Sequence, residues 1–264
     1  MKYKTYCKPT WCPACPDFLI WKCFDDVLSQ LENEGFSSKN FVVVAGIGCH
    51  GKIFDYLNLN SFYGLHGRAI ATAQGIKLAN PKLNVVCFVG DGDTYNEGIE
   101  HLIFAAKRNA DIKVFVHDNR TFALTICQYT GTSPKGFKGS STPEGSIDEP
   151  FNPLEIVLSA GATFIARAFT GHFDHMKKVM KEAILHKGFA FVEILQPCIT
   201  FFDMTPIYKE RTYMFESENV ESKEKALEKI KEWDYKNGNK IPIGIFYKTK
   251  KSTFEEEFFK SSQF

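Results

Sequence analysis

Short apolar runs and amphipathic segments alternate strictly along most of this chain, and this alternation restricts the possible folds more than any other feature. The first of these runs, residues 41–48, is short and uninterrupted, as expected of a strand that is buried on both faces. The predicted strands are 41–48, 85–90, 112–119, 162–169 and 189–195. Segments with helical spacing of apolar residues precede and separate them, at 17–35, 65–81, 96–109, 152–161 and 172–188. Strand and helix in strict turn predict an α/β fold with a doubly wound, mostly parallel sheet.

The composition fits a globular protein with one large core. Hydrophobic residues make up 44% of the 264 residues and charged residues 24%, the balance of an ordinary globular chain. Because the alternation ends near residue 202, we expect one α/β domain over residues 1–202. Residues 203–264 combine charge runs with scattered aromatic residues. They predict a short C-terminal extension that packs on this domain or on a partner.

Charge and hydropathy argue against two classes of partner. The formal net charge of +1 provides no basic field for nucleic acid or an anionic membrane surface. No apolar run reaches the roughly 18 residues of a membrane span, and the N-terminal residues lack the pattern of a signal peptide. We therefore expect a cytoplasmic protein that binds neither nucleic acid nor membrane.

Two carboxylates follow the second predicted strand, in the sequence Gly90-Asp91-Gly92-Asp93. Ligands of open parallel sheets bind beyond the carboxyl ends of the strands, so these residues are expected at a binding edge. The glycines allow a phosphate to approach the backbone, and the helix predicted to begin near Asn96 presents free N–H groups. Because two aspartates repel a phosphate, a cation is expected between them, and Mg²⁺ binds carboxylate and phosphate oxygens together.

Asn119 ends the next predicted strand at an equivalent height, and its amide oxygen is a suitable further ligand for Mg²⁺. A Gly-Asp-Gly sequence followed by an asparagine at about this interval resembles the thiamine-diphosphate-binding motif. Alone, Gly-Asp-Gly is more often a turn with a helix cap, but two strand ends that each carry an oxygen ligand favour the coenzyme site. For Asp93, a helix cap and a coenzyme contact are equally open interpretations.

The chain has eight cysteines, at positions 7, 12, 15, 23, 49, 87, 127 and 198. Cys12 and Cys15 form a Cys-x-x-Cys pair, whereas Cys49 and Cys198 each follow a predicted strand and are expected at the same edge as Asp91. Four thiolates that meet there could hold tetrahedral zinc or a 4Fe–4S cluster, and their spacing does not separate the two. A thiamine coenzyme nearby favours the cluster, because zinc cannot accept an electron. Cys87 fits a buried strand position, and no role is predicted for Cys7, Cys23 and Cys127.

Eight short blocks of the chain resemble, in the same order, the β subunit of the 2-oxoacid:ferredoxin oxidoreductases, a family that includes pyruvate and 2-oxoglutarate synthases. The blocks are WCPAC, GIGCHGK, LHGRAIA, GDGDTYNEG, HDNRTFALT, NPLEIVLSAGATFIAR, LQPCITF and IPIGIFY. The resemblance covers nearly the whole chain and implies the thiamine-diphosphate-binding fold.

Carried over by position, the resemblance implies ligands for three cofactors. A 4Fe–4S cluster would be bound by Cys12, Cys15, Cys49 and Cys198, and Mg²⁺ by Asp91, Asn119 and the carbonyl of Thr121. The residues expected to line thiamine diphosphate are Ile47, Gly48, Cys49, His50, His66, Gly92, Asp93, Ala123 and Leu124. His66 has an alternative interpretation as a capping histidine or part of a buried polar network.

Two departures from the family pattern bear on the loop and the substrate. Ala14 and Pro16 stand where the family usually has glycine, and an alanine is tolerated at 14 only if the backbone there is not left-handed. Ile126-Cys127 replaces the usual Gly-Gly or Lys-Gly. An apolar Ile126 cannot pair with the second carboxylate of 2-oxoglutarate, so a pyruvate-like substrate is favoured. Lys52 could supply a charge for the substrate or simply be solvated.

The implied activity is oxidative decarboxylation of a 2-oxoacid to acyl-coenzyme A and CO₂, with electrons passing through the cluster to ferredoxin. In this family the glutamate that activates thiamine belongs to another subunit or domain, and no segment here resembles that domain. We therefore expect a chain that is inactive without an α subunit, with γ and δ subunits as possible further partners. Two alternatives stay open: a non-oxidative thiamine-dependent decarboxylase or synthase with structural zinc, and a non-catalytic electron-carrier module.

Overall fold

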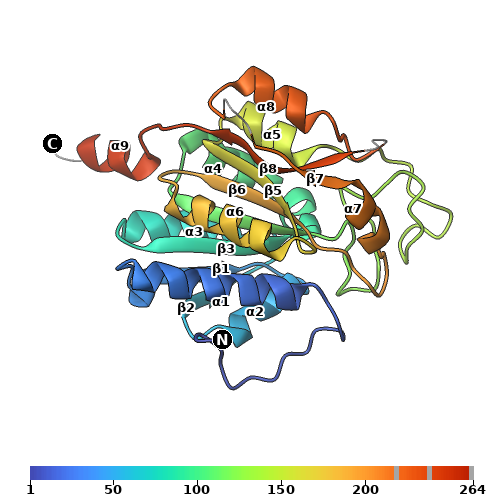
Figure 1. Cartoon of the computed structure of the whole chain (residues 1–264), viewed down its shortest axis with the longest axis horizontal. Coiled ribbons are helices and arrows are strands. Elements are labelled where there is room, and N and C mark those ends of the chain that lie inside the picture. The colour runs from blue at the N-terminus through green and yellow to red at the C-terminus, as the bar shows by residue number, and fades with distance from the viewer. Residues whose placement is uncertain (217–219, 237–239, 262–264) are drawn as a thin grey trace.

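One eight-stranded sheet organises the part of the chain that the computed structural model describes, residues 1–216, 220–236 and 240–261. Its strand order is β2-β1-β3-β4-β6-β5-β8-β7 (Figure 1). Neighbouring strands run parallel except β5 and β8, which are antiparallel. The strands are β1 (Phe41–Ala45), β2 (Asn60–Tyr63), β3 (Asn84–Gly90), β4 (Ile112–Asp118), β5 (Phe164–Phe169), β6 (Ala190–Leu195), β7 (Thr212–Met214) and β8 (Ile241–Lys248). The predicted doubly wound, mostly parallel sheet is confirmed.

Helices cover both faces of this sheet, α1 and α6 on one side and α3, α4, α5 and α8 on the other (Figure 1). Helix α6 changes face because the chain turns back after β5 to reach β6, which lies between β4 and β5, and crossover connections keep a right-handed sense. The helices are α1 (Asp17–Asn33), α2 (Ile53–Tyr56), α3 (Ala69–Ala79), α4 (Ile99–Arg108), α5 (Pro153–Ala160), α6 (Phe173–Leu185), α7 (Thr205–Arg211), α8 (Lys223–Ile230) and α9 (Phe254–Ser261). None of the described helices is both long and apolar enough to cross a membrane.

Strand β3 shows why the central strands read as continuous apolar runs. Phe88 points toward α1, where its ring centroid lies 4.9 Å from that of Phe24. Its neighbours Cys87 and Val89 belong to the core on the opposite face. Since side chains alternate between the two faces, every side chain of a strand covered by helices on both sides lies in a core, and a charged residue there needs a buried partner, as Arg167 of β5 has in Glu193 of β6. Cys87, fully buried, is a core side chain as predicted.

The C-terminal segment is built into this architecture. Strand β8 pairs with β5, and Trp233 and Tyr235 join a small apolar cluster that also contains Phe169 and Leu195 from β5 and β6. Helix α9 projects from the rest of the molecule at one end (Figure 1). Strands on both sides of the predicted boundary between residues 202 and 203 belong to the same sheet. The division of the chain at this point stays a prediction.

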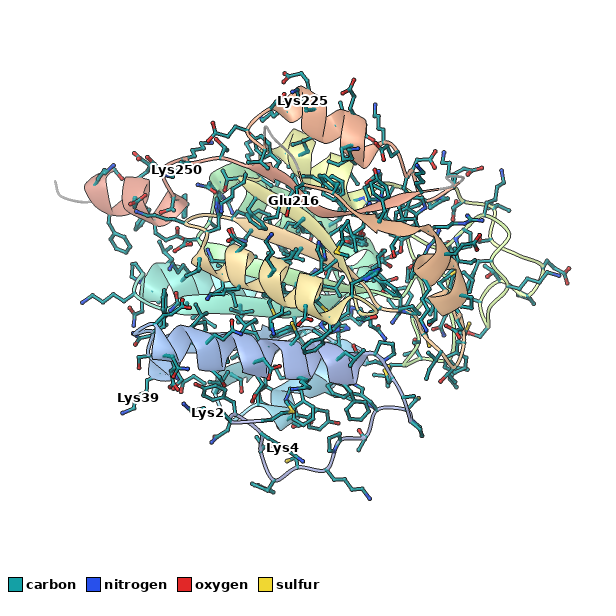
Figure 2. The ribbon with its side chains drawn as sticks, in the orientation of Figure 1. Lys2, Lys4, Lys39, Glu216, Lys225 and Lys250 are labelled. Atoms are coloured by element: carbon teal, nitrogen blue, oxygen red, sulfur yellow. The ribbon has the colours of Figure 1, made fainter. Side chains whose placement is uncertain are left out.

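The segment before α1 is held against the edge of the sheet. Lys4 forms an isolated β-bridge with Leu57, and the indole Nε1 of Trp11 donates a hydrogen bond of 2.6 Å to the carbonyl of Cys49. Figure 2 shows Lys2 and Lys4 on this segment, on the same side of the molecule as α1. These contacts bring the Cys-x-x-Cys pair to the carboxyl ends of the strands.

Candidate active site

A cavity lies at the carboxyl ends of β1, β3 and β4, and we call it the Asp91 cavity. Gly90 is paired with His117 in the sheet, so Asp91, one residue beyond Gly90, and Asn119, two residues beyond His117, emerge at the same edge. Both line the cavity, together with Ile47, Gly48, Cys49, His50, His66, Gly92, Asp93, Thr121, Ala123 and Leu124. The structure therefore brings together every residue that the sequence predicted for Mg²⁺ and thiamine diphosphate. Their roles as ligands stay predictions.

Asp91 is a buried carboxylate, with 2% of its surface exposed. Burial raises its pKa to about 6, while a hydrogen bond from the Thr130 hydroxyl to Oδ2 (2.6 Å) acts in the opposite direction. A carboxylate in such surroundings gains from a cation beside it, which restores the stabilisation that water would otherwise provide.

Hydrogen bonds fix the orientation of Asn119 and Thr121, which line the same cavity as Asp91. The backbone N–H of Thr121 donates to Oδ1 of Asn119 (3.0 Å), and the Asn119 amide donates to Oε1 of Gln196 (3.4 Å). Thr121 is buried and its hydroxyl donates to the carbonyl of Gln128. Carboxylate, amide and carbonyl oxygens are the ligands that Mg²⁺ prefers, so this set of residues fits that ion.

Asp93 does not cap a helix, so this interpretation of its role is wrong. Its Oδ1 accepts hydrogen bonds from the backbone N–H of Ile47 (3.2 Å) and of Gly67 (2.8 Å), which lie in two other loops. His66 Nδ1 lies 3.0 Å from the same oxygen, and His50 Nε2 lies 3.7 Å from Oδ2. Burial alone would raise its pKa, but the two histidines and the Gly67 N–H hold the pKa of Asp93 well below its ordinary value. Asp93 therefore ties three loops together beneath the cavity.

Glycines beneath this cavity let the His50 ring pack closely against the backbone. A Cβ added at Gly48 would meet the His50 ring at 2.7 Å, and one at Gly90 would meet the same ring at 2.6 Å. In addition, the buried atoms His50 Nε2 and Asp93 Oδ2 lack a hydrogen-bond partner among the described residues. These two atoms lie 3.7 Å apart, and buried polar atoms without a hydrogen bond fit a polar ligand such as a diphosphate.

Four thiols line a second, adjacent cavity of about 200 Å³, which we call the thiol cavity. They are those of Cys12, Cys15, Cys49 and Cys198, the four cysteines selected from the sequence. All four are free cysteines. The two cavities share Cys49, Asn119, Ala123 and Leu124 in their walls.

The four thiols line the cavity, but their side chains are not arranged with the geometry of a metal site. Across the described residues, no group of three or more histidine, cysteine, aspartate or glutamate side chains is arranged to hold a metal ion. Burial, followed by the charge of Asp17, raises the pKa of Cys49 to about 12 and that of Cys15 further. The neutral thiols of Cys15 and Cys49 do not repel each other, and metal binding would release their protons. A set of sulfur donors around one cavity fits a soft metal centre such as an iron–sulfur cluster.

The presence of a Cβ at Ala14, in the turn between Cys12 and Cys15, led to the expectation that the backbone there is not left-handed, and this expectation is wrong. The φ of Ala14 is +62°, so the backbone there is left-handed although the residue is not glycine. Ile126 and Cys127 also have positive φ, at 70° and 64°. Such conformations are unfavourable for residues with a Cβ and tend to occur at functional sites.

Lys52 and Ile126 both line the thiol cavity. The Lys52 ammonium donates a hydrogen bond of 3.2 Å to the carbonyl of Thr10, so it is held at the rim of the cavity. Ile126 is 65% exposed. Neither residue lines the Asp91 cavity, and their roles toward a substrate stay predictions.

Sequence reasoning missed the side chains that support the site. Thr130 and Thr132 come from the loop after β4, and their hydroxyls hold Asp91 and Asp118. Asp17 lies between Cys15 and His117 in the wall of the thiol cavity. The only signal in the sequence was the unusual length of the Ser- and Thr-rich loop over residues 120–150, which indicates function without identifying residues.

Two family models match consecutive parts of the chain. The model described as "Thiamine pyrophosphate enzyme, C-terminal TPP binding domain" matches residues 46–194, which include both strand ends of the Asp91 cavity. A second model, which describes the C-terminal part of the pyruvate ferredoxin oxidoreductase beta subunit, matches residues 198–262.

Curated proteins and a solved structure are similar over most of the chain. The 2-oxoacid:ferredoxin oxidoreductase 1, subunit beta, of Aeropyrum pernix is 38% identical over 96% of this chain and 82% of its own length. The 2-oxoglutarate synthase subunit KorB of Archaeoglobus fulgidus is 38% identical over 77% of this chain and 75% of its own. The structure of a 2-oxoglutarate:ferredoxin oxidoreductase from Magnetococcus marinus, with 2-oxoglutarate, coenzyme A and succinyl-CoA bound, superposes with a TM-score of 0.93. It is 32% identical in sequence, covering 98% of this chain and 88% of that one.

Proposed function

This chain belongs to the family of 2-oxoacid:ferredoxin oxidoreductase β subunits, and we propose that it supplies the thiamine-dependent site of such an enzyme. The proposed reaction converts a 2-oxoacid, coenzyme A and oxidised ferredoxin into an acyl-coenzyme A, CO₂ and reduced ferredoxin. The observation that carries this proposal is the adjacency of the Asp91 cavity and the thiol cavity, which have Cys49 in common.

Asp91, Asn119 and the Thr121 carbonyl would hold Mg²⁺, and the ion would in turn hold the diphosphate of the coenzyme. Gly48 and Gly92, which line the Asp91 cavity, would lie near the coenzyme. The turn Gly92–Asn96 follows β3 directly, and its N–H groups would face the negative charge of the diphosphate.

Cys12, Cys15, Cys49 and Cys198 would hold a 4Fe–4S cluster. When bound, thiamine diphosphate supplies an electron sink for decarboxylation, and the cluster supplies an acceptor for single electrons. The role of this chain is to fix the distance between the two groups. Cys49 would do so directly, because it lies in the wall of both cavities and its neighbours Gly48 and His50 line the Asp91 cavity.

A pyruvate-like substrate fits the apolar side of this junction better than a dicarboxylate does. Ile126 presents a hydrocarbon side chain to the thiol cavity and offers no charge to a second carboxylate. Lys52 lies at the rim, where one carboxylate of the substrate would find it. Similar proteins include both general 2-oxoacid and 2-oxoglutarate enzymes. Replacing Ile126 by lysine would supply a charge for a second carboxylate, so this variant should shift substrate preference toward 2-oxoglutarate.

A second chain would complete the site. Leu124, Ile126 and Phe201 line the cavity mouth, yet they are 46%, 65% and 42% exposed. Leu65, next to His66, is 77% exposed. An apolar rim around a binding site is typical of a surface that another chain covers. An α subunit is the proposed partner, ferredoxin the proposed acceptor and the cytoplasm the proposed location.

Anaerobic purification with any co-purifying chains tests the proposal. We expect brown protein with a broad absorption band near roughly 400 nm, bound thiamine diphosphate, and 2-oxoacid-dependent reduction of ferredoxin that requires coenzyme A. The isolated chain should show no turnover, because the activating glutamate is expected on the partner.

Each alternative has its own outcome in the same preparation. Colourless protein with stoichiometric zinc and release of CO₂ without electron transfer would indicate a non-oxidative enzyme. Brown protein that binds no thiamine diphosphate would indicate an electron carrier. Turnover by the isolated chain would contradict the expected need for a second subunit.

A further inference from the structure

Two buried hydroxyls approach the carboxylate of Asp91, and that of Thr130 is much the closer. The Thr130 hydroxyl donates a hydrogen bond of 2.6 Å to Oδ2, and both side chains are 2% exposed. The hydroxyl of Thr132 approaches the same oxygen at 3.5 Å. Both donors come from the long loop after β4, and both approach Oδ2 rather than Oδ1.

The turn that carries Thr130 is itself closed by hydrogen bonds. The Ser133 N–H donates to the Thr130 carbonyl (3.0 Å), and the Thr130 N–H donates to the Ser133 hydroxyl (2.8 Å). That hydroxyl donates in turn to the carbonyl of Arg120 (2.6 Å), just beyond β4. The Gly131 N–H donates to Oδ1 of Asn96 (3.0 Å), in the turn after β3. The donor to Asp91 is therefore fixed against both strand ends of the cavity.

We propose that Thr130 is a positioning residue for Mg²⁺, holding Oδ2 of Asp91 so that Oδ1 faces the ion. This inference rests on the proposed function, because it assumes that the Asp91 cavity takes Mg²⁺ with thiamine diphosphate. A carboxylate held at one oxygen loses the freedom to rotate away from the metal, and removing such an outer hydrogen bond typically weakens metal binding by about 10- to 100-fold.

Thr132 provides a matched comparison within the same loop. Its side chain is fully buried, and its hydroxyl donates mainly to Oδ1 of Asp118, at 2.9 Å. If Thr130 only anchored the loop, replacing either threonine by valine would have the same effect on the site. If Thr130 positions Asp91, the two replacements would differ.

The experiment measures Mg²⁺ affinity by calorimetry, with thiamine diphosphate at a fixed concentration, on the full-length chain with its co-purifying subunits. For T130V we expect binding about 10- to 100-fold weaker than in the unaltered protein. T130S, which keeps the hydroxyl, should bind within about threefold of it. T132V removes only the longer contact of 3.5 Å with Asp91, so it should weaken Mg²⁺ binding by less than T130V does, even if its melting temperature falls.

Three results would overturn the proposal: T130V that binds as tightly as the unaltered protein, T130S that binds as weakly as T130V, or T132V that matches T130V. If T130V does not fold, T130A replaces it with the same expectations. Failure of the unaltered protein to bind Mg²⁺ with thiamine diphosphate would instead refute the proposed function itself.

Discussion

Asp17 and His117 lie 100 residues apart in the sequence, yet Oδ1 of the aspartate and Nδ1 of the histidine are 2.7 Å apart. Each side chain is only 1% exposed. Burial lowers the pKa of His117, which favours a neutral ring, and a carboxylate can only accept, so Nδ1 carries the donated proton. This pair joins the start of α1 to the end of β4, beside the thiol cavity.

Removing the histidine should leave a buried carboxylate without its partner. We expect His117→Phe to lower the free energy of unfolding by about 3 kcal/mol, measured by urea denaturation. The double variant Asp17→Asn with His117→Phe should be less destabilised, because the unpaired charge is gone. A double variant that is as unstable as His117→Phe, or a single variant that loses less than about 1 kcal/mol, would contradict this role.

The four thiols of the thiol cavity should act as a set. Serine at position 12, 15, 49 or 198 should lower iron and acid-labile sulfide in anaerobically purified protein to well below the unaltered content. Cys7→Ser and Cys127→Ser are the controls, because these thiols are also partly exposed but do not line the cavity. Equal iron loss in both groups would show that the assignment of ligands is wrong.

The left-handed backbone at Ala14 should make glycine the more stable residue there. We expect Ala14→Gly to raise the free energy of unfolding by about 0.5–1 kcal/mol, since glycine adopts this φ without steric cost. Ala71→Gly, inside α3, is the control and should lower it by about 1 kcal/mol. Chemical denaturation distinguishes the two signs, and a loss of stability in both variants would argue against strain at Ala14.

His186 should make the protein less stable in acid. Burial, with the nearby Lys113 and Lys248, lowers its pKa to about 4. Between the ordinary histidine value and pH 4, the unfolded chain therefore binds a proton that the folded chain does not. Stability is fully present above about pH 6.5 and decreases as the pH falls toward 4.

The variant His186→Asn isolates this contribution. Between about pH 7 and pH 5 the unaltered protein should lose about 1–2 kcal/mol more stability than the variant, measured by urea denaturation at each pH. We expect the variant to have a lower free energy of unfolding at every pH, because it loses the hydrogen bond between His186 Nε2 and the Thr163 hydroxyl, which lie 2.9 Å apart. Parallel pH profiles for the two proteins would contradict the assignment.

The central strands could be predicted because a strand that is buried on both faces has a run of apolar residues in its sequence, as β3 does. The helices could be predicted from the segments between these runs. Strand β2 could not be predicted, because its residues are largely exposed and short strands of this kind have no period to detect. Strand β8 carries an apolar sequence, but nothing local indicates that it pairs antiparallel with β5. That pairing depends on where the end of the sheet lies in space.

The site was predictable to the extent that its residues follow strand ends. Asp91, Asn119 and Cys49 sit at positions where the fold class alone decides location. Their supports could not be predicted: Thr130 lies in a loop without periodicity, and the partner of Asp17 is 100 residues away. Local sequence allowed Asp93 to be a cap, whereas the folded chain uses it to bind two distant N–H groups.

Electron paramagnetic resonance tests the central claim most directly, namely that this chain holds a thiamine site next to an iron–sulfur site. The anaerobic complex would be frozen with a 2-oxoacid, with and without thiamine diphosphate and Mg²⁺, in the absence of ferredoxin. This arrangement predicts the signal of a reduced 4Fe–4S cluster only when both the 2-oxoacid and thiamine diphosphate are present. No signal under any condition in coenzyme-loaded protein, or a signal that appears equally without the coenzyme, would contradict it.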